Sequence, residues 1–412
     1  MSSSLFGTIS GSAVANVMVD GWLTIPLMKR IGFKPHVAAA IEAVSSTGGQ
    51  IMPPVMGAAA FVMAEMLGIP YIKVCVAAAI PALLYYIALY FMIDFEALKL
   101  KLKGLPQDEL PNARKVFASG FIYLIPIAVL LYFMTVQMYT PLRSAVYAMI
   151  ATVLVSFFKR ATRMGPVKIL KPLEKGAKSS LEVALACACA GIIVGVFNLT
   201  GLGMSFSSML IDVSRGHLLA LLFLTMVSSL ILGMGLPTTA CYIILAVLVA
   251  PAMVQMGVLP IAAHMFVFYF GCISAVTPPV ALAAYAGAGL ANAPPAKTGY
   301  AASKLAMAGF ILPYMFVYGP ELLMIGKMSD IILATATSIL GVFLLAASIQ
   351  GYLIRQANFL ERVVLFAAAL LLIKPGLYTD LLGLAGFLLV LGIQILRGRR
   401  SLKGHPTTDY IH

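Results

Sequence analysis

Two proline pairs that follow runs of hydroxyl side chains are the residues of this chain most suited to binding an ion. Both phrases read P-P-V-x-x-A-A, one beginning at Pro53 and Pro54 and the other at Pro278 and Pro279. The hydroxyl residues before them are Ser45, Ser46 and Thr47 in the first case, and Ser274 and Thr277 in the second. Because proline has no backbone N–H, each pair frees carbonyl oxygens about a turn upstream. Hydroxyl and carbonyl oxygens together suit a sodium ion.

A second break in an apolar segment precedes each proline pair, at a nearly equal spacing. These upstream breaks contain Gly11, Ser12 and Asn16 in the first half, and Gly235, Pro237, Thr238 and Thr239 in the second. Apolar segments interrupted by Gly and Pro at corresponding places in two halves indicate the binding site of a secondary transporter. We therefore predict two sodium sites. The first site joins residues 12–16 to residues 45–48 and includes Gly48. The second site joins residues 235–239 to residues 274–277.

An anionic substrate is expected between the two sodium sites, near the positively polarised N-termini of the half-helices. The alternative for any single Ser or Thr is structural, because such residues often pack between membrane helices or bond back to their own backbone. The prediction therefore rests on the whole set of hydroxyls beside paired breaks.

Two acidic residues in apolar surroundings are further candidates. Glu42 lies just before the first hydroxyl run, and Asp20 follows the first upstream break. Ionisable residues inside a membrane are costly and are functional candidates by default. Either residue could relay protons or hold a cation, and either could equally be a paired, buried group that fixes helix packing.

The composition requires a membrane. Of the 412 residues, 61% are hydrophobic and 10% are charged, and the mean hydropathy is +0.99. A soluble domain cannot bury so much apolar surface, and long uncharged stretches are typical of membrane spans. The net charge is +13, and the basic residues are concentrated in short loops between apolar segments. This distribution indicates orientation in the lipid bilayer rather than binding of nucleic acid.

We predict an all-α polytopic membrane protein built of inverted repeats, with two re-entrant hairpins and two broken transmembrane helices. The expected spans cover residues 70–93, 116–137, 141–158, 179–200, 305–325 and 331–353, with a weaker pair at 363–373 and 377–396. The broken elements cover residues 11–28, 37–66, 218–256 and 260–291. The corresponding division is 1–93 for the first repeat, 94–217 for connecting spans with a basic loop, 218–325 for the second repeat, and 326–412 for the C-terminal spans and basic tail.

Loop charge predicts that the two repeats are inverted. The first hairpin leaves the membrane at Lys29 and Arg30, and positive loops stay in the cytoplasm. The second leaves at residues 255–257, which carry no positive charge, and is therefore expected to open to the outside. Inverted repeats are the usual basis of alternating access around a midplane site.

The chain resembles the large membrane subunit of TRAP (tripartite ATP-independent periplasmic) transporters, in particular the fused permeases that work with TAXI-type binding proteins. The resembling phrases are residues 11–16, 45–54, 233–239 and 277–279, and the likeness runs at least through residues 5–325. Residues 374–380 are also similar to the tail of such fused permeases.

The resemblance implies a sodium-coupled importer, multi-pass in a bacterial inner membrane, that moves substrate by an elevator-like motion. It implies a periplasmic substrate-binding protein that delivers a small organic anion. Family members have spans before the first hairpin, whereas this chain starts inside it. A small membrane subunit or an N-terminal fused region is therefore expected to complete the first sodium site.

Other classes of function are weighed against this one. A related carrier could take its substrate directly from solution, and a truncated product would be inactive. An intramembrane enzyme needs a catalytic Ser/His or Asp pair at bilayer depth, and the nearest nucleophile-like string, residues 203–207, lies near an expected outer loop. No phosphate-cradling Gly-Lys-Ser/Thr loop is present, which argues against an ATP-driven pump. We expect no enzyme activity, no cofactor and no transition metal, and transported Na⁺ with H⁺ as the alternative.

Overall fold

The computed structural model describes residues 2–109, 112–159 and 162–403. These residues form helices, and the extended structure among them is an isolated bridge between Tyr352 and Gln356. Five helical segments within this part of the chain are long and apolar enough to cross a membrane: α5 (Tyr71–Lys99), α9 (Pro166–Thr200), Pro295–Tyr318, α18 (Met328–Gln350) and Leu377–Arg397 within α20 (Leu377–Lys403). The predicted all-α polytopic membrane fold is confirmed.

The first half contains two interrupted helical elements. The first consists of α1 (Ser2–Ser10) and α2 (Ala13–Ile31), and the second of α3 (Pro35–Gly49) and α4 (Ala58–Leu67). Gly11 separates α1 from α2 with a φ of +65°, a left-handed conformation that glycine adopts at little cost. The segment is therefore broken where the sequence placed the upstream break.

The second half repeats this order. Its elements are α11 (Leu218–Gly233), α12 (Thr238–Leu248), α13 (Ala250–Gln255), α14 (Pro260–Ile273) and α15 (Leu282–Ala291). The break between α11 and α12 contains Gly235 with a φ of +78°. A short 3₁₀ turn, Ser274–Val276, follows α14 and leads into the second proline pair.

The backbones of the two proline turns share two features. The peptide bonds Pro53–Pro54 and Pro278–Pro279 are both cis. Two residues beyond each pair, Met56 and Ala281 have positive φ values of 59° and 36°. These are unusual for side chains with a Cβ atom. The repeated phrase in the sequence therefore folds into a repeated turn.

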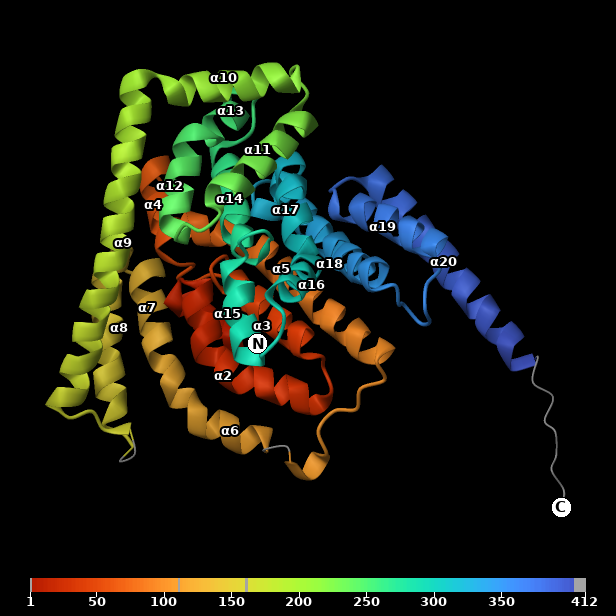
Figure 1. Cartoon of the computed structure of the whole chain (residues 1–412), viewed down its shortest axis with the longest axis horizontal. Coiled ribbons are helices and arrows are strands. Elements are labelled where there is room, and N and C mark those ends of the chain that lie inside the picture. Colours follow the sequence, from red (N-terminus) through yellow and green to blue (C-terminus); the bar gives the residue numbers. More distant parts are fainter. Residues whose placement is uncertain (1, 110–111, 160–161, 404–412) are drawn as a thin grey trace.

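The broken elements form the centre of the molecule, and their contacts follow the same correspondence (Figure 1). α3 packs against α1, α2 and α15, and α14 packs against α11, α12 and α4. When α1 to α4 are matched to α11, α12, α14 and α15, each of these three contacts of α3 has its counterpart in a contact of α14. The two halves are thus interleaved, because each central helix touches the final helix of the other half.

The connecting helices differ from the predicted spans at their ends. They are α6 (Ala113–Gly120), α7 (Ile125–Thr135), α8 (Pro141–Ser156), α9 and α10 (Leu202–Ser214). The span predicted over residues 116–137 is divided, because Pro126 near the start of α7 lacks an N–H and begins a new helix after a 3₁₀ turn. α9 is longer than predicted and runs for 35 residues along one edge of the molecule (Figure 1).

The C-terminal part consists of α16 (Pro295–Leu305), α17 (Met307–Tyr318), α18, α19 (Phe359–Ile373) and α20. α18 packs against both α5 and α19, and α19 packs against α20. Figure 1 shows α19 and α20 projecting on the side of the molecule opposite α9. The helices α18, α19 and α20 therefore reach the centre through α5, whereas α16 packs directly on α3 and α17 on α14.

Candidate functional site

The two upstream breaks meet at one side chain, Gln50, at the end of α3. Its amide nitrogen donates to the carbonyl oxygen of Gly11 at 2.8 Å and to the hydroxyl oxygen of Thr238 at 2.9 Å. Gln50 is 2% exposed, and its amide oxygen has no hydrogen-bond partner among the described residues. The predicted sites gave Gln50 no role, although a polar side chain three residues before a proline pair in an apolar segment is a signal that could have found it.

Asn16 lies beside a close contact between α1 and the end of α3. A Cβ atom at Gly7 would lie 2.8 Å from Asn16 Nδ2, 2.8 Å from Gly49 Cα and 3.3 Å from the carbonyl oxygen of Ser46. Asn16 Nδ2 donates to the carbonyl oxygen of Ser3 at 2.7 Å, whereas Asn16 Oδ1 is buried without a partner in the described part of the chain. The first break thus places an unpaired amide oxygen beside the end of α3, and such an oxygen can bind a cation.

Two hydroxyls of the first predicted site, those of Ser12 and Thr47, already have protein partners. Ser12 Oγ accepts from the backbone N–H of Ala15 at 3.3 Å and caps α2. Thr47 Oγ1 donates to the carbonyl oxygen of Ala43 at 2.9 Å, one turn earlier in α3. A hydroxyl that donates keeps lone pairs on its oxygen, so these bonds leave Thr47 able to accept or to bind a cation.

In the second half, Ser274 joins the two broken elements. Its hydroxyl donates to the carbonyl oxygen of Gly233 at 3.1 Å and to that of Gly271 at 2.7 Å. Thr277 Oγ1 donates to the carbonyl oxygen of Ile273 at 2.8 Å. Ser274 therefore contacts the last residue of α11, just before the break that contains Gly235.

No hydrogen bond to Ser274 is seen for the remaining residues of the second predicted site in the described part of the chain. The hydroxyl oxygen of Thr238 accepts a hydrogen bond from Gln50 in the other half of the chain. Thr239 is buried, with 9% of its surface exposed. A Cβ atom at Gly235 would meet no heavy atom within 4 Å. The positive φ of Gly235, and not a close contact, therefore favours glycine at this position. At Gly11 the backbone is closely approached as well, because a Cβ atom there would lie 2.7 Å from Gly57 Cα.

Tyrosine hydroxyls satisfy the carbonyl groups of both proline turns. The hydroxyl of Tyr71 donates to the carbonyl oxygen of Val55 at 2.5 Å and also lies 3.1 Å from that of Pro54, and Tyr285 donates to the carbonyl oxygen of Pro279 at 2.7 Å. Pro54 and Pro279 occupy corresponding positions in the repeated phrase. These bonds pair carbonyl groups that the proline turns leave without helical partners.

Two further tyrosines, both on α5, hold the end of α3. Tyr85 donates to the carbonyl oxygen of Val44 at 2.9 Å, and Tyr86 donates to that of Ser45 at 2.7 Å. The ring of Tyr85 also lies against Gly48, where no side chain would fit. The carbonyl oxygen of Ser45 is thus already paired, which makes it a weaker ligand than its position in the sequence indicates.

Glu42 accepts hydrogen bonds from hydroxyls on three helices. Ser3 on α1 and Ser46 on α3 donate to Oε1 at 2.7 and 3.1 Å, and Thr24 on α2 donates to Oε2 at 2.5 Å. The residue is 2% exposed. Its carboxylate makes no ion pair in the described part of the chain. Glu42 therefore ties the first hairpin together through neutral donors.

Asp20 lies outside this cluster. Thr24 donates to the backbone carbonyl oxygen of Asp20 at 3.1 Å, but this bond does not involve the carboxylate. One carboxylate oxygen of Asp20 is buried and has no hydrogen-bond partner among the residues described. Asp20 is therefore separate from Glu42 in its interactions, and both of the roles considered for it remain predictions.

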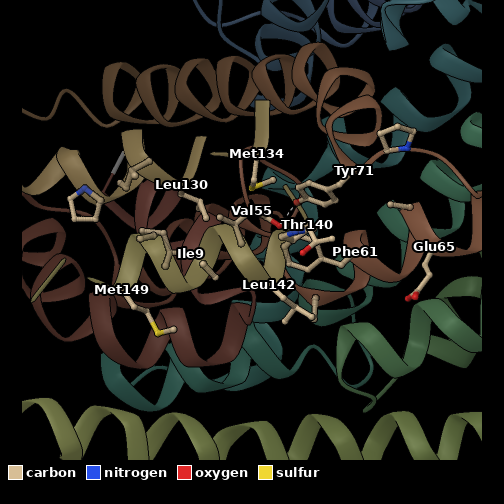
Figure 2. A pocket seen from close by; sticks show the side chains of 18 of the residues that line it. Ile9, Val55, Phe61, Glu65, Tyr71, Leu130, Met134, Thr140, Leu142 and Met149 are labelled. Carbon is tan, nitrogen blue, oxygen red and sulfur yellow. Dashed lines mark hydrogen bonds between the residues drawn. The ribbon is translucent and has the colours of Figure 1, made fainter. Parts of the chain in front are cut away.

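One cavity lies beside the breaks rather than between them. It has a volume of about 1150 Å³ and lies among α1, α4, α7 and α8. Its lining includes Ile9, Phe61, Leu130 and Met149, and Figure 2 shows Glu65 at one end, apart from these apolar side chains. A lining with few hydrogen-bond donors does not suit a carboxylate, so this cavity is not the expected substrate site.

A multi-span helical protein whose two halves bring hydroxyl-lined helix breaks together belongs to the class of membrane permeases. The model of the family described as "Tripartite ATP-independent periplasmic transporter, DctM component" matches residues 1–331, and the chain belongs to this family. The family assignment made from the phrases around the breaks is confirmed.

Several relatives share this part of the chain at low identity. The uncharacterized protein YgiK of Salmonella typhimurium is 23% identical over 325 residues, which cover 78% of this chain and 73% of that protein. The isethionate TRAP transporter permease protein DctMQ of Oleidesulfovibrio alaskensis is 24% identical, over 70% of this chain and 45% of its own length. The sialic acid TRAP transporter large permease protein SiaM of Vibrio cholerae is 24% identical, over 69% of this chain and 66% of its own. The chain therefore spans less than half of the DctMQ relative.

Proposed function

We propose that this chain is the transport core of a sodium-coupled secondary importer of small organic anions in the inner membrane of a bacterium. A periplasmic substrate-binding protein delivers the substrate, and a small membrane subunit or an N-terminal fused region completes the permease. The breaks change between inward-facing and outward-facing positions by an elevator-like motion of the hairpins against the surrounding helices. In this proposal the chain has no enzymatic role and no resident cofactor.

The observation that carries the proposal is the contact of the two breaks through Gln50. Its amide joins the break at Gly11 to the start of α12 at Thr238. Sites formed by discontinuous helices from two repeats are the usual place for substrate and coupling ion in secondary transporters. The buried, unpaired Oδ1 of Asn16 supports a sodium site in the first half, because a buried acceptor without a partner is costly unless a ligand supplies one.

The positions of basic residues support inverted repeats. Lys29, at the end of the first hairpin, donates to the carbonyl oxygen of Ala291 at the end of α15, at 3.2 Å. His36, at the start of α3, lies within electrostatic reach of Lys34 and Lys297. The C-terminal ends of α2 and α15 thus lie together at one end of the molecule, where basic residues gather. That arrangement is expected when the halves are inverted and this end faces the cytoplasm.

We expect a sodium gradient to drive uptake of labelled organic acids into proteoliposomes that contain the whole permease. The loaded binding protein is added outside, and initial rates are measured with inward gradients of sodium or potassium chloride. Sodium should accelerate uptake and potassium should not, because the unpaired oxygens select a small cation that is moved together with substrate. Equal rates in both salts, or uptake that needs no binding protein, would contradict the proposal in its present form.

Removing the hydroxyls of Thr47 and Thr277 should weaken sodium dependence without affecting membrane insertion. Thr47→Val and Thr277→Val keep the side-chain shape and remove one oxygen each. The sodium concentration for half-maximal uptake is expected to rise about tenfold in each variant, which is the effect of losing roughly 1.4 kcal/mol of binding free energy. The matched control is Thr335→Val, since the hydroxyl of Thr335 on α18 bonds back to Ile331 in the same way but lies on a helix outside the breaks. Unchanged sodium dependence in both test variants would remove these residues from the ion sites.

Proton coupling is the second candidate, and the surroundings of Glu42 favour it. A buried carboxylate that receives hydroxyl donors from α1, α2 and α3 could take up a proton when one hairpin segment moves away. Uptake driven by an inward proton gradient in sodium-free buffer would favour this candidate. The same experiment in the presence of both gradients separates it from sodium coupling.

A further inference from the structure

Gln50 lies where the helices that follow the two upstream breaks begin. α2 starts at Ala13, directly after the break that contains Gly11, and α12 starts at Thr238. The amide of Gln50 contacts both of these breaks. The first turn of a helix has N–H groups without helical partners and carries partial positive charge, so an anion is stabilised there.

The start of α12 has no side-chain cap. Ser12 caps α2 by accepting from the N–H of Ala15, whereas Pro237 precedes α12 and provides no side-chain cap. Among the described residues, therefore, the first N–H groups of α12 receive no capping side chain of their own. Thr238, which Gln50 contacts, is the first residue of this uncapped helix.

The orientation of the Gln50 amide is fixed by chemistry. The carbonyl oxygen of Gly11 can only accept, so the nitrogen of the amide must face it. Both protons of that nitrogen are then used, by Gly11 and by Thr238. The amide oxygen is left buried and without a partner in the described structure. A buried acceptor without a partner is rare in folded proteins, and it indicates a ligand that donates a hydrogen bond to it.

Building on the proposed function, we propose that Gln50 contacts the substrate and determines its class. A carboxylate oxygen of the substrate takes the place of Thr238 Oγ1 as acceptor of one Nε2–H of Gln50, in front of the start of α12. The other Nε2–H continues to bond to Gly11. The oxygen of Gln50 accepts from a donor on the same substrate, so the substrate is a carboxylic acid with a hydroxyl or amino group beside its carboxylate.

This assignment predicts discrimination between matched acids. A site that pairs with a hydroxyl group rejects the analogue that lacks it, because its own polar group is then left unpaired. Malate should therefore bind more tightly than succinate, and lactate more tightly than propionate. The comparison uses the purified permease without its binding protein, so that the selectivity of the permease alone is measured.

The test is thermal unfolding of the purified permease in detergent with sodium chloride, titrated with these four acids. The variants are Gln50→Ala, the similarly sized Gln50→Glu, and the control Gln255→Ala, whose side chain is exposed at the end of α13. Gln50→Ala should weaken binding of malate or lactate about tenfold and bind the members of each pair alike, and its unliganded midpoint should fall as well because two buried hydrogen bonds are lost. Gln50→Glu should not respond to any acid at neutral pH, since its carboxylate repels an anion, and Gln255→Ala should behave as wild type.

Three results would overturn the assignment. In the first, Gln50→Ala binds the acids as wild type does. In the second, its unliganded midpoint falls while its dissociation constants do not change, which is the result expected of a purely structural bridge. In the third, none of the four acids stabilises the wild-type protein. A different result would contradict the proposed function itself: no sodium-driven uptake into proteoliposomes for any organic acid that the binding protein supplies.

Discussion

Glu42→Ala is expected to destabilise the permease by about 3 kcal/mol or more and to abolish uptake. The substitution removes the common acceptor of Ser3, Thr24 and Ser46 at a position that is 2% exposed. Hydrogen bonds to a charged group contribute about 1.5–3 kcal/mol each, and a buried donor left unpaired costs its desolvation as well. Thermal unfolding in detergent and uptake in proteoliposomes measure the two effects.

Glu42→Gln separates the packing role of this residue from a role in proton coupling. The amide keeps an acceptor oxygen, and its nitrogen can donate to a hydroxyl oxygen, so the variant should fold. If Glu42 only fixes helix packing, Glu42→Gln transports with the sodium and pH dependence of wild type. If it relays protons, the folded variant loses the response to a proton gradient. Glu65→Ala is the control, because Glu65 is exposed on α4 and its loss should change stability by no more than about 0.5 kcal/mol.

The second large effect is expected from Gly49→Ala, which should prevent the first hairpin from closing. A Cβ atom at this position would lie 2.5 Å from Gly7 Cα and 2.8 Å from Gly7 C. Both are backbone atoms, so no side-chain rotation relieves the clash and α1 must move away from α3. Overpacking of this kind costs about 1–3 kcal/mol or more, and it displaces Asn16 and Gln50 from the break. We expect uptake to fall by more than about tenfold, since that range corresponds to one to two orders of magnitude.

Gly191→Ala is the matched control for this substitution. Gly191 is also a helical glycine, on α9, and a Cβ atom there would meet no heavy atom within 4 Å. Alanine is favoured over glycine inside a helix by about 1 kcal/mol, so this variant should be as stable as wild type or slightly more stable. Normal uptake by Gly49→Ala would show that the contact between α1 and α3 opens during transport at no cost.

Much of the fold could be predicted from residue types and spacing. The breaks at Gly11, Pro53, Gly235 and Pro278 are visible in the sequence because glycine and proline restrict the backbone in ways that do not depend on distant contacts. The ends of the spans were less predictable. Pro126 divided one predicted span, and α9 continued beyond another, because apolar composition marks what can enter a membrane but not where each helix starts.

The sequence by itself determined that this is an all-α membrane protein of the DctM family, with paired helix breaks surrounded by hydroxyl groups. Apolar length, proline and glycine are local properties, and they fix the class of fold. Only the tertiary structure decided which polar groups meet. It joined Gln50 to Thr238 across 188 positions of the chain and gathered three hydroxyls on Glu42. It also assigned tyrosines of α5 to the end of α3. These pairings depend on how helices pack side by side, and a hydrogen bond between distant residues leaves no spacing in the sequence from which it could be inferred.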